Sequence, residues 1–189
     1  MLASRSEVPL EALESTSVPA KVNPELAKGS FRQDYDLIIG EGLPERYGWM
    51  LMPYFEKLIL YADFWARDEQ GAKLDDYHLK LDLSYYKSWP PSAGFINPES
   101  RSFDPQKDQK WFPKLSSAPQ NTEAQFHISR DLPSGNRQMI CNSMTLEYYE
   151  SGHNPNPEQR WNGERHNFGT TLSTIQLLLR KPYYGGRSG

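Results

Sequence analysis

The sequence predicts an α+β protein, with an antiparallel sheet early in the chain and a helix near its end. Two segments, residues 58–64 and 77–83, place apolar side chains at every second position, as half-buried strands do. A later segment, residues 170–181, spaces its apolar side chains as a helix does. Because the strands come first and the helix follows, this order favours α+β over a doubly wound parallel sheet.

Composition favours one globular domain with many turns. The chain has 189 residues, 37% of them hydrophobic, and it contains 15 prolines and 13 glycines. That length is enough for one substantial core and short for two. The formal net charge is -3, so the charge balance gives no reason to expect a nucleic-acid partner.

Residues 1–30 are predicted to form a flexible N-terminal arm, and residues 31–189 a single domain. The arm carries Ser, Pro, Glu and Lys with few large apolar side chains, so it cannot bury enough surface to offset the entropy of ordering. The amino end lacks a secretion signal, no apolar run reaches membrane-spanning length, and a single cysteine excludes an internal disulfide. We therefore expect a cytoplasmic protein with no membrane partner.

The two alternating segments predict an antiparallel hairpin around the turn "DEQGAK". The residues that share its buried face are Leu58, Leu60, Ala62 and Phe64 in the first strand and Tyr77, Leu79, Leu81 and Leu83 in the second. The stretch "AGFINP", residues 93–98, predicts a third strand, and "AQFHISR", residues 124–130, predicts another before the turn "LPSG". The expected sheet is therefore an antiparallel meander of about four strands.

The stretch "TTLSTIQLLLRK", residues 170–181, predicts the helix. Leu172, Ile175 and Leu179 recur at helical spacing. Thr170 is the expected N-cap, and Pro182 is the expected stop.

Three segments in chain order carry a further pattern. They are "YHLKLDLSYYKSWPPSAGFINP" (residues 77–98), "FHISRDLPSGNRQMIC" (residues 126–141), and Trp161 followed by "TTLSTIQLLLRKP" (residues 170–182). Together they resemble the ubiquitin-conjugating E2 enzymes. The resemblance covers residues 49–184 and implies a UBC-like fold with flanking helices. It also implies that Cys141, the chain's only cysteine, is the thioester nucleophile.

The chain departs from the family pattern at three places. Residues 127–129 read His-Ile-Ser where the family has His-Pro-Asn, residues 147–160 resemble an insertion, and residues 182–186 lack the family's acidic residues. These departures resemble divergent bacterial E2-like proteins of anti-phage conjugation operons. That resemblance implies an E1-like activating enzyme and a ubiquitin-like modifier as partners, with a JAB-type peptidase in the same pathway.

Thioester exchange needs an exposed thiolate and hydrogen-bond donors near the oxyanion. On this interpretation Cys141 supplies the thiolate, and Ser129 or Asn142 supplies donors. A protonated His127 would lower the pKa of the thiol, and His153 or His166 would act as a base for the acceptor. The chemistry needs no cofactor, and the cysteine and histidines do not predict a metal site.

Alternatives remain open from the residues alone. Cys141 is also typical of a small buried side chain, and His127 of a structural histidine. The chain would then be an inactive E2-variant that binds partners without catalysis. A third hypothesis takes the tail "YYGGRSG" as that of a modifier precursor cleaved after Gly186, although the same tail is also typical of a frayed Gly-rich terminus.

Overall fold

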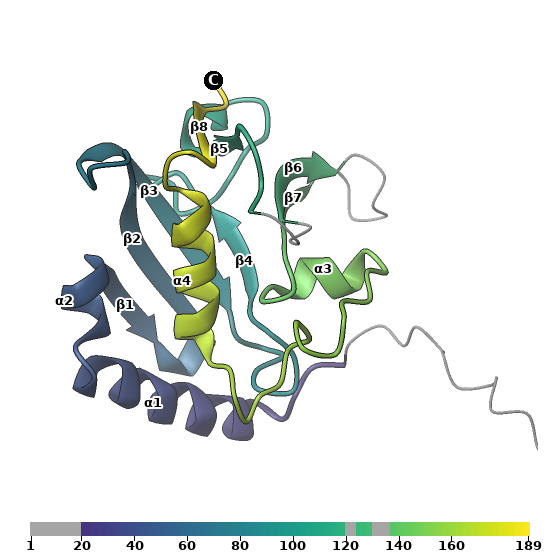
Figure 1. Ribbon diagram of the computed structural model, residues 1–189. Helices are drawn as coiled ribbons and strands as arrows, with labels where there is room; N and C mark the ends of the chain where they lie inside the picture. The colour runs from purple at the N-terminus through teal and green to yellow at the C-terminus, as the bar shows by residue number, and fades with distance from the viewer. Residues whose placement is uncertain (1–19, 120–123, 130–136) are drawn as a thin grey trace, which may run out of the picture.

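The computed structural model describes residues 20–119, 124–129 and 137–189 and shows a mixed α+β arrangement (Figure 1). The central antiparallel sheet has the sequential order β1-β2-β3-β4. Its strands are β1 (Met50–Tyr54), β2 (Ile59–Arg67), β3 (Lys73–Asp82) and β4 (Ser92–Phe95). The predicted α+β class with a four-stranded antiparallel sheet is confirmed. The prediction that residues 124–130 belong to this sheet is wrong, because its fourth strand is β1, and β6 (Gln125–Ser129) pairs with β7 (Arg137–Cys141) in a separate sheet.

Two antiparallel strand pairs, four α-helices and two short 3-10 helices, η1 (Phe55–Lys57) and η2 (Gln109–Trp111), complete the described fold. The pairs are β5 (Pro113–Leu115) with β8 (Tyr184–Arg187), and β6 (Gln125–Ser129) with β7 (Arg137–Cys141). The α-helices are α1 (Pro24–Gly40), α2 (Leu43–Tyr47), α3 (Leu146–Glu150) and α4 (Phe168–Leu178). The predicted strand at residues 124–130 corresponds to β6, whereas the expected "LPSG" turn lies outside the described residues.

The apolar alternation of β2 and β3 builds the inner face of the sheet. Leu60 lies opposite Leu81, and Ala62 lies opposite Leu79, so that the two predicted apolar rows share one face. These side chains are fully buried, and α4 lies across that face (Figure 1). The opposite rows of β2 and β3 are only half-buried, as expected for a sheet covered on one face.

Helix α4 begins earlier than predicted. Its N-cap is Asn167, whose side chain accepts a hydrogen bond from the Thr170 backbone N–H at 3.2 Å. Thr170 is the third helical residue, and its hydroxyl accepts a hydrogen bond from the Asn167 backbone N–H in return. This reciprocal capping explains why the threonine resembled a cap in the sequence. The predicted apolar stripe is confirmed, since Leu172 and Ile175 are fully buried.

The prediction of an arm as far as residue 30 is wrong from Pro24 onward, where α1 begins. The Asn23 side chain accepts a hydrogen bond from the Glu25 backbone N–H and caps the helix. Phe31 is fully buried, with its ring 4.7 Å from that of Phe55. Sparse but well-placed apolar residues therefore fold this segment onto the domain. Residues 1–19 lie outside the described residues.

The C-terminal segment is a strand, so the interpretation as a frayed terminus is wrong. Gly185 and Gly186 belong to β8, which pairs with β5. The Tyr184 hydroxyl donates a hydrogen bond to the Asp75 carboxylate, and the Arg187 guanidinium donates another to the same carboxylate at 2.7 Å. These contacts attach the tail to β3.

Candidate functional site

The β6–β7 hairpin positions Cys141 as the last residue of β7. In its register Gln125 lies opposite Cys141 and His127 lies opposite Met139. The Gln138 side chain attaches the hairpin to the central sheet: it accepts a hydrogen bond from the Phe95 backbone N–H at 2.8 Å and donates one to the Phe95 carbonyl. This side-chain amide takes the place of a strand partner at the β4 edge.

Cys141 is buried, with 3% of its surface exposed. The predicted nucleophile therefore occupies the position expected of a small packing residue. With so little of the residue exposed, a bulky thioester partner is expected to reach its sulfur only after local opening of the surrounding structure.

The register of the hairpin places His127 nearer to Cys141 than it places Ser129. Gln125 lies opposite Cys141, and His127 lies two residues further along β6 on the same face. His127 is therefore the diagonal neighbour of Cys141, and such neighbours are about 7–8 Å apart in antiparallel sheets. Its side chain is exposed. Ser129 is opposite Arg137, four residues from Gln125 along β6, or about 13 Å at the usual strand rise. The register therefore does not bring Ser129 together with Cys141.

His153 follows α3 and is exposed. Its ring stacks on Tyr148, with centroids 4.6 Å apart and an interplanar angle of 20°.

The segment 147–160, which resembled an insertion, begins inside α3 with Glu147, a side chain that is only 1% exposed. Its two carboxylate oxygens accept hydrogen bonds from the Ala93 backbone N–H, at 3.3 and 3.2 Å.

Asn142 shapes the turn that follows Cys141. Its side-chain Oδ1 accepts a hydrogen bond from the Met144 backbone N–H at 2.9 Å, and its carbonyl accepts one from the Thr145 backbone N–H at 3.0 Å. The residue is 7% exposed, and its Nδ2 has no hydrogen-bond partner among the described residues. Buried amide donors are normally paired. Of the predicted site residues, Asn142 therefore retains a donor that the described fold does not use.

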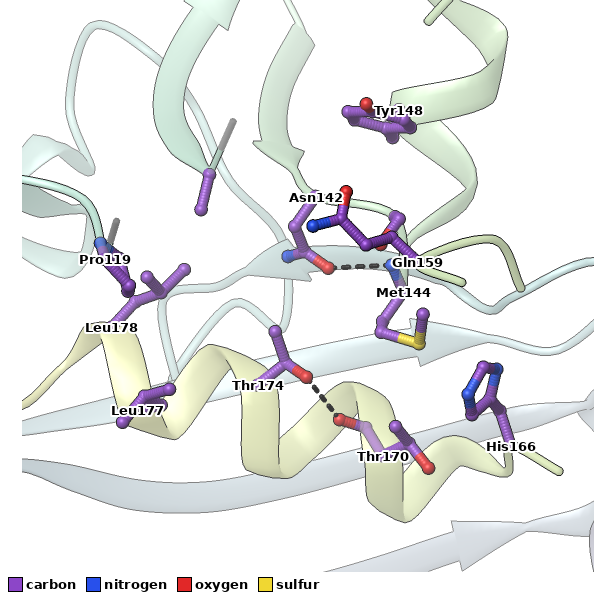
Figure 2. Close-up of a pocket in the computed structure, with 12 residues that line it drawn as sticks. Pro119, Asn142, Met144, Tyr148, Gln159, His166, Thr170, Thr174, Leu177 and Leu178 are labelled. Carbon is purple, nitrogen blue, oxygen red and sulfur yellow. Dashed lines mark hydrogen bonds between the residues drawn. The ribbon is translucent and has the colours of Figure 1, made fainter. Parts of the chain in front are cut away.

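A cavity of about 270 Å³ lies between α4 and the segment after Cys141 (Figure 2). Asn142, Ser143 and Met144 line it on one side, and Thr170 and Thr174 line it from the helix. None of the described residues that line it carries a formal charge at neutral pH. Over the described part of its lining, the pocket therefore combines a few neutral polar groups with an apolar wall.

His166 lines the same cavity, whereas His153 does not. Its Nδ1 accepts a hydrogen bond from the Asn162 backbone N–H at 3.1 Å, so the neutral ring carries its proton on Nε2. Burial, with a smaller contribution from Arg165, lowers the pKa of His166 below its usual value. His166 is therefore neutral at pH 7. Of the two candidate bases, it is the one that shares a cavity with Asn142.

Several residues of this region were not predicted. Gln138 and Glu147 attach β7 and α3 to β4, and the Thr171 hydroxyl donates a hydrogen bond to the Met144 carbonyl at 2.8 Å. No local pattern marks Gln138 or Glu147. Thr170 and Thr174 have the i, i+4 spacing that places two side chains on one helix face, and this signal was available in the sequence.

Comparisons with protein-family models, curated proteins and solved structures find no match to this chain. Within residues 20–119, 124–129 and 137–189, no three His, Cys, Asp or Glu side chains gather as metal ligands would. Over the same residues, no helix combines the length and apolar character needed to cross a membrane.

Proposed function

We propose that the chain is an E2-like carrier that accepts a ubiquitin-like protein as a thioester on Cys141. The observation that carries the proposal is the position of Cys141. It ends a hairpin that Gln138 joins to β4, the last strand of a four-stranded antiparallel meander. A UBC-like fold would place its nucleophile after such a meander and before a helix packed on the sheet.

In the proposed reaction the Cys141 thiolate attacks the carbonyl carbon of a thioester on an E1-like enzyme. A C–S bond to Cys141 forms, the C–S bond to the E1-like enzyme breaks, and that sulfur leaves as a thiolate. An acceptor nucleophile then loses its proton to a base, attacks the new thioester and displaces Cys141 as a thiolate. The unpaired Nδ2 of Asn142 supports this proposal, because Asn142 directly follows Cys141 in the chain and an unused buried donor is the kind of group that stabilises an oxyanion.

The proposed partners are an E1-like activating enzyme and a ubiquitin-like modifier, with a JAB-type peptidase in the same pathway. A pathway of the anti-phage conjugation type would operate in the reducing cytoplasm, where a lone cysteine stays a thiol. A role as modifier precursor is not favoured, because Gly185 and Gly186 lie in β8, which pairs with β5 through Gly186 and its neighbours.

A second candidate function is an inactive E2-variant that binds partners without forming a thioester. The observation that favours it is the burial of Cys141, at 3% exposure. The two candidates share the fold and differ only in whether the hairpin opens to release the thiol.

The deciding experiment incubates the protein with the E1-like enzyme and ubiquitin-like protein of its pathway and ATP. A carrier forms a covalent adduct that thiol reductants cleave. Cys141→Ala abolishes the adduct, and Cys141→Ser converts it to an oxyester that resists the reductant. An adduct that survives Cys141→Ala contradicts the carrier proposal. Partner binding without any adduct supports the inactive variant.

A further inference from the structure

The geometry points to the cavity beside α4 as a binding site for a neutral amide with a branched aliphatic body. This inference does not rest on the E2-like proposal: both use the Nδ2 of Asn142, but Cys141 is not among the described lining residues, and binding in the cavity needs no reaction at its thiol. Its principal groups are Asn142, Thr174 and the apolar side chains of Met144, Leu177 and Leu178.

The donor of the site is the Nδ2 of Asn142. The turn bond to the Met144 backbone N–H holds Oδ1, which fixes the orientation of the amide and leaves Nδ2 without a partner among the described residues. Figure 2 shows this nitrogen turned toward the space bounded by Pro119, Leu178 and Thr174. A buried, oriented and unpaired N–H group selects a ligand that brings an acceptor.

The acceptor of the site is the Thr174 hydroxyl. It donates its hydrogen to the Thr170 carbonyl at 2.8 Å, so its oxygen can only accept from a ligand. An amide group brings both an acceptor for the Nδ2 of Asn142 and a donor for the Thr174 hydroxyl, so it supplies the two kinds of partner that these walls lack. Met144, Leu177 and Leu178 then surround the remainder of the ligand with apolar surface.

The described part of the lining, which does not include residues 120–123, offers a ligand no charged partner. No Lys, Arg, Asp or Glu is among the described lining residues. His166 carries no charge at pH 7, because burial lowers its pKa. A carboxylate or phosphate in this cavity would therefore lose its hydration without gaining a cationic partner. An uncharged amide loses less hydration free energy when it enters the cavity, and it forms two hydrogen bonds there.

The test titrates the full chain with isovaleramide while backbone and side-chain amide signals are followed by NMR. We expect saturable shifts at Asn142, Met144, Thr170 and Thr174. Isovalerate, which has the same shape and a negative charge, is expected to bind at least about tenfold more weakly. N-acetyl-leucinamide presents the same chemistry as part of a peptide. If it binds more tightly than isovaleramide, the natural source is a peptide segment; if it binds more weakly, the source is a free amide.

Two variants test the assigned groups. Asn142→Asp keeps the Oδ1 acceptor of the turn and removes the donor, and Thr174→Val keeps the shape and removes the acceptor. Each is expected to weaken isovaleramide binding about tenfold, the usual effect of one hydrogen bond. Ser173→Ala is the matched control, because the Ser173 hydroxyl also donates to the Thr170 carbonyl but does not line the cavity.

Three results would overturn the inference. The first is the lack of any saturable shift up to the solubility limit, which would mean that water alone satisfies Asn142. The second is equal affinity for isovaleramide and isovalerate. The third is unchanged affinity in Thr174→Val, a variant that tests the site even if Asn142→Asp does not fold.

Discussion

At the residue scale, Cys141 is the last residue of β7 and is buried, with 3% of its surface exposed. A water-soluble electrophile reaches such a thiol only when the structure opens locally. The reactivity of this one side chain therefore measures how readily the hairpin exposes its cysteine. The proposed carrier needs that opening, and the inactive variant does not.

We predict that a negatively charged maleimide labels Cys141 at least about tenfold more slowly in the native protein than in urea, because local opening costs more than ~1.4 kcal/mol. Timed quenching and mass spectrometry measure both rates. Cys141→Ala is the blank, since the chain has no other cysteine. Equal rates in the native and denatured protein would show that the thiol is accessible, contrary to its burial.

Asn142 illustrates a residue whose two side-chain atoms have different roles. Oδ1 stabilises the turn after Cys141, and Nδ2 remains available to a bound group. The sequence suggested Asn142 as a donor but contained no sign that half of the amide is used structurally. The same residue thus belongs both to the local fold and to the candidate site.

At the scale of elements, the β6–β7 hairpin is attached to the central sheet through side chains. The Gln138 amide forms two hydrogen bonds with the backbone of Phe95. Gly94 lies beside it, with the Gln138 amide carbon 3.4 Å from where a Cβ would stand. A small residue at position 94 therefore lets the glutamine approach the strand closely.

We predict that Gln138→Ala lowers the free energy of unfolding by about 1–3 kcal/mol, because it leaves the Phe95 N–H and carbonyl without partners. Urea denaturation followed by tryptophan fluorescence measures the change. Gln125→Ala is the control: Gln125 is an exposed glutamine on the same hairpin, and its loss is expected to change stability by less than about 0.5 kcal/mol. Equal effects of the two substitutions would show that the Phe95 contacts do not hold the hairpin.

At the scale of the whole molecule, a chain of hydrogen bonds joins the C-terminal strand to the sheet. The Tyr184 hydroxyl donates to Asp75, so the Tyr77 hydroxyl donates to Tyr184 across 2.7 Å. Burial raises the pKa of Tyr77 to about 12, and the same cause raises the pKa of Tyr184. Both hydroxyls must stay protonated for the network to persist.

This network predicts a loss of stability at high pH. An unfolded tyrosine has a pKa of about 10, so the folded state binds more protons than the unfolded state above that value. The stabilisation is complete below pH 10 and is lost as the pH rises toward about 12, the raised pKa of Tyr77. Thermal melts recorded from pH 8 to 11 measure this loss of stability.

Tyr77→Phe removes one titrating group from this network, and the decline above pH 10 is expected to be shallower in this variant. Tyr183→Phe is the matched control, because this neighbouring side chain takes no part in the Tyr184–Tyr77–Asp75 hydrogen bonds. If both variants lose stability with the same slope as the unmodified protein, the network does not govern the alkaline transition.

The β2–β3 hairpin and the last helix could be predicted because each depends on a local period. A two-residue period in β2 and β3 and a helical period in α4 place apolar side chains on one face whatever the rest of the chain does. The start of α1 was missed because its residues are mostly polar. Its stability comes from Ala27 and Phe31, which reach a core formed by distant segments.

By itself, the sequence determined the class of the fold, the inner face of the sheet and the position of the only cysteine in chain order. Only the tertiary structure decided that Cys141 is buried, that the Nδ2 of Asn142 has no partner among the described residues, and that the Gly-Gly tail lies in a strand paired with β5. The physical reason is the range of the interactions. Local periodicity is written in neighbouring residues, whereas burial and hydrogen-bond pairing depend on segments that meet only after folding.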